Sequence, residues 1–125
     1  MFKDKIDTIK VILDDLLNAT SNIDGCVLVT MDGFPVSSVM KSEYDKDLLA
    51  SMAAALVGVG EQFSEQLLNG NIEQTFIKTS KGYAVMNLVT SEFILIILTD
   101  EHIKLGIVFY ALQEIIKKLE ALVNF

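Results

Sequence analysis

Residues 25–39, GCVLVTMDGFPVSSV, decide the fold because they predict a β-hairpin that contains one deeply buried strand. Its first half, CVLVTM, is rich in β-branched and apolar residues, which is typical of a strand covered on both faces. Asp32-Gly33 predicts a tight turn, since the primed turns of hairpins need positive φ angles. Pro35 has no N–H to donate, so we expect the returning strand FPVSSV at an edge of the sheet.

The remainder of the chain predicts helices and strands by the spacing of its apolar residues. Apolar residues at helical spacing predict helices at 2–18, 44–68 and 101–123. Apolar runs separated by short turns predict strands at 72–78, 83–89 and 93–99. Asp45 and Asp100 are the expected N-caps of the second and third helices, because their side chains accept bonds from free backbone N–H groups.

Strands that are apolar on both faces need helices on both sides of the sheet. The sequence therefore predicts an α+β fold in the order α-β-β-α-β-β-β-α. In it, a five-stranded antiparallel sheet lies between the second helix and the pair formed by the first and third. No linker, repeat or low-complexity segment interrupts the pattern, so we expect a single domain over residues 1–125.

The second helix has two apolar faces, and its orientation is an interpretation. We place the larger residues toward the core: Leu48, Met52, Leu56, Val59, Phe63 and Leu67. The small residues Ala50, Ala54 and Gly58 then face outward, with Val57 and Glu61 beside them. Since glycine costs about 1 kcal/mol in a helix interior, we expect this small-residue face to bind a partner. The alternative is a solvated face made of good helix formers.

Composition excludes several classes of partner. The net charge of −7 and the pI near 4.5 argue against nucleic-acid binding and against attraction to anionic lipid. All ten basic residues are lysines, so the chain supplies no arginine finger. No apolar run is long enough to insert into a membrane. The opening MFKDKIDTIK has no signal-peptide pattern, and we expect a cytoplasmic protein.

Chemistry-bearing residues are few. Cys26 is the only cysteine and His102 the only histidine, so neither a disulfide nor a histidine metal cluster can form within the chain. Gly58-Val59-Gly60 lies inside a predicted helix and does not form a phosphate-binding loop. Glu43, Asp45 and Asp47 fit acids that face a helix N-terminus better than a metal cluster. We therefore expect no catalytic residue, metal or cofactor, and no enzymatic activity.

The order of these segments resembles the roadblock family, the dynein-light-chain-type roadblock domains, close to bacterial and archaeal GTPase-associated members. The likeness covers nearly the whole chain. It rests on GCVLVTMDGFPVSS, on the alanine-rich LLASMAAALVGVGEQF, on NIEQTFIKTSKGYAVMNLV, and on FILIILTDEHIKLGIVFYAL with Leu105-Gly106 at the start of the last helix. The resemblance implies a roadblock/profilin-like sandwich that does not itself bind nucleotides.

The resemblance also implies a homodimer that regulates or scaffolds small Ras-like GTPases, with the second helices of two subunits side by side. In the family, the third strands pair into one continuous sheet. The strand IEQTFIK has no proline, and its free edge would be a liability in a monomer. The expected dimer interface is Ile72, Glu73, Gln74, Thr75, Phe76 and Ile77. A structural adaptor or light-chain-type scaffold without effect on GTP turnover is the alternative, and an enzyme or small-ligand sensor is a third.

Overall fold

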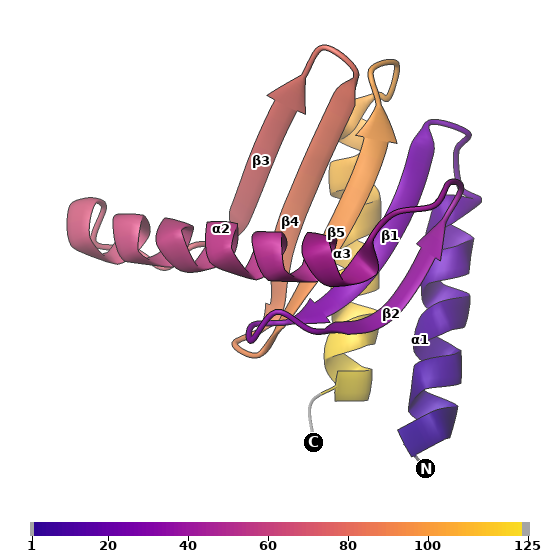
Figure 1. Cartoon of the computed structure of the whole chain (residues 1–125), viewed down its shortest axis with the longest axis horizontal. Coiled ribbons are helices and arrows are strands. Elements are labelled where there is room, and N and C mark those ends of the chain that lie inside the picture. Colours follow the sequence, from indigo (N-terminus) through magenta and orange to yellow (C-terminus); the bar gives the residue numbers. More distant parts are fainter. Residues whose placement is uncertain (1, 124–125) are drawn as a thin grey trace.

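The computed structural model describes residues 2–123, which form three helices and five strands (Figure 1). The helices are α1 (Phe2–Leu17), α2 (Lys46–Leu67) and α3 (Leu105–Val123). The strands are β1 (Ile23–Thr30), β2 (Pro35–Met40), β3 (Gln74–Thr79), β4 (Gly82–Thr90) and β5 (Phe93–Asp100). The predicted order α-β-β-α-β-β-β-α is confirmed.

The strands form one antiparallel sheet in the order β2-β1-β5-β4-β3. The buried strand expected from CVLVTM is confirmed, because Cys26, Val27, Leu28 and Val29 of β1 are all 0% exposed. β2, which starts at Pro35, lies at one edge of the sheet as predicted, and β3 lies at the other. Both unpaired edges of the sheet therefore belong to strands whose edge positions were expected from their sequences.

The turn of the first hairpin is a three-residue loop. The backbone N–H of Thr30 donates to the carbonyl of Phe34 at 2.8 Å, and that of Gly33 donates to Thr30 at 3.0 Å. Gly33 has a φ of 92°, whereas Asp32 is not among the described residues with positive φ. The expected primed turn is therefore wrong in detail, and the loop matches the longer hairpin turn that places one glycine in the left-handed region.

Helices cover both faces of the sheet, as predicted. On one face, α1 and α3 bury Leu13, Leu16, Leu112 and Leu119 against a sheet surface that includes Cys26. On the other face, α2 and the sheet together form a second, separate hydrophobic cluster. Because side chains alternate along a strand, β1 contributes to both clusters.

Of three expected element ends, one is confirmed and two differ in the structure. Asp45 caps α2 as predicted, since its carboxylate accepts the N–H of Leu48 at 3.1 Å. β3 begins only at Gln74, so Ile72 and Glu73 precede the strand. Asp100 does not cap α3: it is the last residue of β5, and α3 starts at Leu105. The carboxylate of Asp100 is held instead by other partners in the turn.

Candidate protein-protein interface

The orientation of α2 is the reverse of the expected one. Its small residues face the sheet: Ala50, Ala53 and Val57 are 0%, 2% and 2% exposed. They pack on sheet residues of the second cluster, namely Val27, Val29, Met86, Ile94 and Ile96. The spacing of the helix was predicted correctly, but the face assigned to the core was wrong. Small side chains let the backbone of α2 approach the sheet of its own subunit, which is the close contact that we had assigned to a partner.

The large apolar residues of α2 consequently point to solvent. These side chains form a stripe along the whole helix, which we call the outer face of α2. Its members are Leu48 (55% exposed), Met52 (56%), Leu56 (42%), Val59 (69%), Phe63 (56%) and Leu67 (66%). A contiguous apolar stripe of this kind on a monomer surface marks an interaction site far more specifically than scattered apolar residues do.

The five residues expected to bind a partner divide between the core and the flank of α2. Ala50 and Val57 are buried in the monomer, so they are not available to a partner in this fold. Ala54, Gly58 and Glu61 are half-buried on the side of the helix. A β-carbon on Gly58 would meet no other atom within 4 Å, so this glycine touches nothing that requires its small size.

The outer edge of β3 is unpaired in the single chain. Thr75, Phe76 and Ile77 lie in this strand, and the ring of Phe76 stacks on Tyr83 with centroids 5.5 Å apart. A two-residue turn joins Thr79 to Gly82, so these two form a hydrogen-bonded pair. Hydrogen-bonded pairs alternate with non-hydrogen-bonded pairs along an antiparallel ladder. Phe76 and Lys78 belong to the non-hydrogen-bonded pairs, so their N–H and C=O groups point away from β4.

The C-terminal part of α2 extends beyond the edge of the sheet. Figure 1 shows α2 lying across the sheet from β1 to β3 and continuing past β3. Gly60 lies close to the start of β3, since a β-carbon there would lie 2.6 Å from Cδ1 of Ile72 and 3.7 Å from Oγ1 of Thr75. The part of α2 that runs past β3 carries the outer-face residues Phe63 and Leu67, which are exposed. The edge strand β3 and this overhanging end of α2 thus lie at the same border of the molecule.

Groups that could carry out chemistry remain isolated from one another. Burial raises the pKa of Cys26 to about 12, so its thiol is not a nucleophile at neutral pH. The side chain of His102 is 76% exposed in the turn before α3, where its Nε2 lies 3.4 Å from a carboxylate oxygen of Glu101. Within residues 2–123, no three His, Cys, Asp or Glu side chains lie close enough together to hold a metal ion. Within the same residues, no helix has the length and hydropathy to cross a bilayer.

Comparison with known proteins places the chain among roadblock domains. A protein of Methanocaldococcus jannaschii, described as uncharacterised, is 31% identical over 106 residues, which cover 85% of this chain and 92% of that protein. MglB of Myxococcus xanthus has a TM-score of 0.90 at 21% identity, covering 99% of this chain and 93% of that one. A Roadblock/LC7 domain from Streptomyces avermitilis has a TM-score of 0.87 at 15% identity, covering 93% and 98%.

The two solved structures share the fold of this chain over 99% and 93% of its length. The family assignment rests on a separate match, which spans the chain from α1 to the end of β5. The Roadblock/LC7 domain model matches residues 9–99, and the chain therefore belongs to the Roadblock/LC7 domain family.

Proposed function

We propose that this chain forms a homodimer that binds and regulates a small Ras-like GTPase, and that it is not itself an enzyme. The observation that carries the proposal is the outer face of α2, whose six large apolar side chains are 42–69% exposed. Family membership supports the class of partner, because the roadblock resemblance implies regulators or scaffolds of such GTPases. The isolated cysteine and histidine give no support to an active site within the chain.

The overhanging end of α2 supports the homodimer. If two copies join their β3 strands about a two-fold axis, each overhanging end comes to lie over the sheet of the other subunit. The two α2 helices would then run side by side, and Phe63 and Leu67, exposed on the outer face of α2 in the single chain, would gain an apolar contact with the helix of the other subunit. The same pairing satisfies the free N–H and C=O groups of Phe76 and Lys78, which removes an exposed strand edge.

The N-terminal half of α2 is the expected contact for the GTPase. Leu48 and Met52 lie over strands of their own subunit, away from the β3 edge, so dimerisation leaves them available. The chain has no arginine, and it cannot insert a guanidinium into the nucleotide site of a partner. Regulation would therefore act by favouring one arrangement of the catalytic residues that the GTPase already holds.

The test is to purify the small Ras-like GTPases of the source organism and to measure GTP hydrolysis and nucleotide exchange with and without the chain. Met52→Asp should abolish binding, because it places a charge on the outer face of α2 without disturbing the core. Tyr110→Asp is the matched control, since Tyr110 is 74% exposed on α3, on the opposite side of the sheet. Circular dichroism would establish that both variants fold.

Each outcome has a defined meaning. A GTPase that binds the wild type and Tyr110→Asp but not Met52→Asp, with a changed turnover rate, supports the proposal. The same binding pattern with unchanged hydrolysis and exchange makes the protein an adaptor. Equal binding by both variants removes the outer face of α2 from the contact, and no binding by any GTPase contradicts the proposal.

A further inference from the structure

The edge strand β2 offers free backbone groups in its second half. The N–H of Lys41 donates to the carbonyl of Asp24 at 2.8 Å, so this pair closes the β1–β2 ladder. Hydrogen-bonded pairs alternate with non-hydrogen-bonded pairs in an antiparallel ladder. Counted from Lys41 and Asp24, the pairs Met40 with Gly25 and Ser38 with Val27 are the non-hydrogen-bonded ones. The N–H and C=O groups of Ser38 and Met40 therefore point away from β1, toward the open edge.

This half of β2 lacks the proline, the bulge and the charged side chains that often protect an edge strand. Pro35 and the irregular register opposite Leu28 and Val29 occupy only the beginning of the strand. The sequence PVSSVM contains no charged residue that would discourage pairing. An added strand could therefore bond to Ser38 and Met40 without meeting a proline or a charge on β2.

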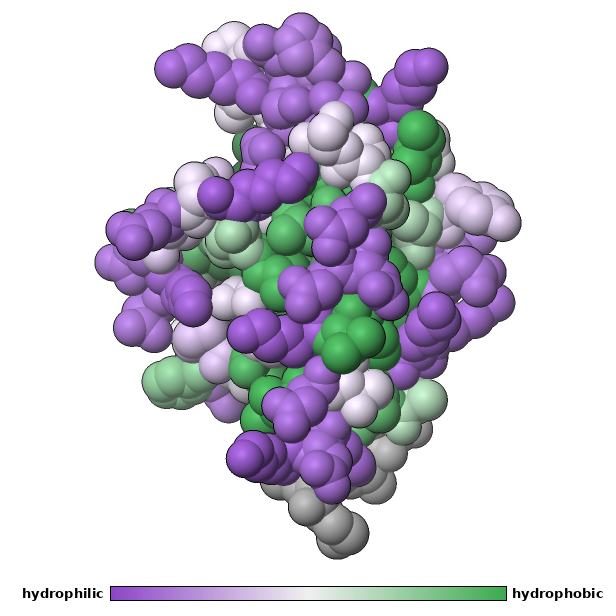
Figure 2. Space-filling view, turned by 90° about the vertical axis from the view of Figure 1, so that its right-hand side faces the viewer, coloured by the Kyte–Doolittle hydropathy of each residue, from purple (hydrophilic) through white to green (hydrophobic). Residues whose placement is uncertain are grey.

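A groove runs along this edge between α1 and the start of α2. Its volume is about 580 Å³, and a second hollow of about 310 Å³ adjoins it and shares Lys10, Ser38 and Lys46. Figure 2 views the molecule from this side, where short stretches of apolar surface lie between hydrophilic side chains. The groove is long enough for an extended segment, since it follows β2 from Pro35 to Met40.

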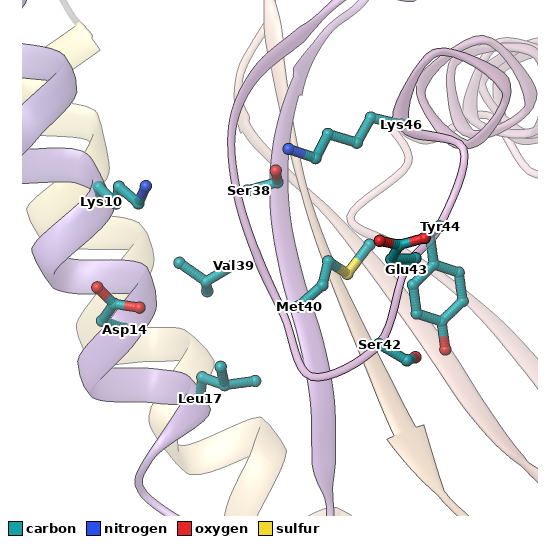
Figure 3. A pocket seen from close by; sticks show the side chains of 10 residues that line it. All are labelled: Lys10, Asp14, Leu17, Ser38, Val39, Met40, Ser42, Glu43, Tyr44 and Lys46. Atoms are coloured by element: carbon teal, nitrogen blue, oxygen red, sulfur yellow. The ribbon is translucent and has the colours of Figure 1, made fainter.

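Charged side chains are arranged unevenly along the groove. Lys10 of α1 and Lys46 of α2 extend toward Ser38 from opposite sides, whereas Glu43 lies beside Met40 (Figure 3). Asp14 lines the groove on α1, one turn beyond Lys10. Among residues 2–123, none of these four charges has an ion-pair partner. By contrast Lys41, just after β2, is already bonded to the carbonyl of Ser21 at 2.9 Å.

We propose that the outer edge of β2 binds an extended segment of a partner protein, which adds a strand to the sheet. Main-chain bonds to Ser38 and Met40 provide the attachment, as in other cases of strand addition. A residue opposite Ser38 lies between the two lysines and should be Asp or Glu. The residue two positions along faces the same side, opposite Met40 and near Glu43, and should be Lys or Arg.

The probe is a displayed library of random ten-residue peptides, selected on the full chain and counter-selected on the Lys10→Glu/Lys46→Glu double variant. We expect enrichment of peptides with an acidic and a basic residue two positions apart. Their affinity should fall by at least about tenfold in the double variant. Lys104→Glu/Lys117→Glu is the matched control, because it makes the same change of charge at exposed positions on another part of the surface.

Amide hydrogen exchange identifies the edge that is used. A bound peptide should slow the exchange of the Ser38 and Met40 N–H groups. Ser38→Pro removes an outward N–H that the β1–β2 ladder does not use, and it should weaken binding. If that variant does not fold, the lysine variants and the exchange measurement still decide the question.

Three results would overturn the proposal. The first is a selection that enriches no peptide. The second is a set of peptides that bind the double lysine variant as well as the wild type, or that protect Phe76 and Lys78 instead of β2. The third is a wild-type assembly larger than a dimer in light scattering, whose mass falls to that of the dimer in Ser38→Pro. A second copy of this chain would then occupy the β2 edge. None of these readouts depends on a GTPase.

Discussion

The side-chain amide of Asn22 donates a hydrogen bond of 2.9 Å to the carboxylate of Asp100 and joins the turn before β1 to the end of β5. The backbone N–H of Asp100 also donates to the carbonyl of Asn22 at 2.9 Å. The second carboxylate oxygen accepts the backbone N–H of His102 at 2.9 Å. The Asn22 amide is the main reason that the pKa of Asp100 lies below its ordinary value of 3.8.

Replacing Asn22 with alanine should therefore raise the pKa of Asp100 toward that ordinary value, as followed by NMR titration of its carboxyl carbon. A carboxyl group with a lowered pKa in the folded state stabilises the fold above its unfolded pKa. The wild type should be more stable than the variant at neutral pH, and this part of the difference should disappear as the pH falls through the folded pKa. Ser21→Ala is the control. An unchanged titration of Asp100 would contradict the assignment.

The thiol of Cys26 should be unreactive in the folded protein. It is 0% exposed, and burial raises its pKa to about 12, so almost no thiolate is present at pH 8. A chromogenic disulfide reagent should modify Cys26 slowly in buffer and rapidly in urea above the unfolding midpoint. Rapid modification in buffer, at a protein concentration where circular dichroism shows the native fold, would be inconsistent with the position of Cys26 in β1.

Two glycines should respond in opposite ways to alanine. Gly33 has a φ of 92°, and a β-carbon there would lie 3.3 Å from Cα of Ser51, so Gly33→Ala should destabilise the fold by about 1–2 kcal/mol. Gly58 is helical with open space around it, so Gly58→Ala should stabilise the fold by about 0.5–1 kcal/mol. Urea denaturation measures both. A loss of stability in Gly58→Ala would indicate that Gly58 contacts a second subunit.

Dimerisation through β3 can be tested at Lys78. Its N–H points away from β4, so Lys78→Pro should remove a bond to a second subunit while sparing the ladder within the chain. We expect the mass measured by light scattering to fall by half relative to the wild type. Lys78→Ala retains the N–H and should stay dimeric. A wild-type protein that is monomeric at micromolar concentration would contradict the proposed homodimer.

The sequence predicted the structure best where a residue type is compatible with only one kind of position in the fold. Pro35 predicted an edge strand and CVLVTM predicted burial on two faces, and both are confirmed. The spacing of α2 was equally clear, but spacing gives the period of a helix and not the face that meets the core. Both faces of α2 are apolar, so size was used to choose between them. The choice was wrong because the sheet accommodates small residues such as Ala50 and Ala53.

Distant contacts explain another difference. Asp100 is as good a helix cap by its type as Asp45, and local sequence does not separate the two. Asp45 caps α2, whereas one carboxylate oxygen of Asp100 accepts from Asn22, which lies 78 residues away in the sequence, and the other accepts the backbone N–H of His102. α3 starts only at Leu105. The contact between Asp100 and Asn22 cannot be read from the residues that neighbour Asp100 in the sequence.

The two faces of α2 separate the stability of this protein from its recognition. Ala50 and Ala53 anchor the helix on the sheet, and any enlargement there would strain the core. Met52 and Val59 contact little of their own subunit, so they can change at small cost to the fold. Descendants of one ancestral roadblock chain could therefore acquire new binding specificities by substitutions on one side of a single helix, while the other side preserved the architecture.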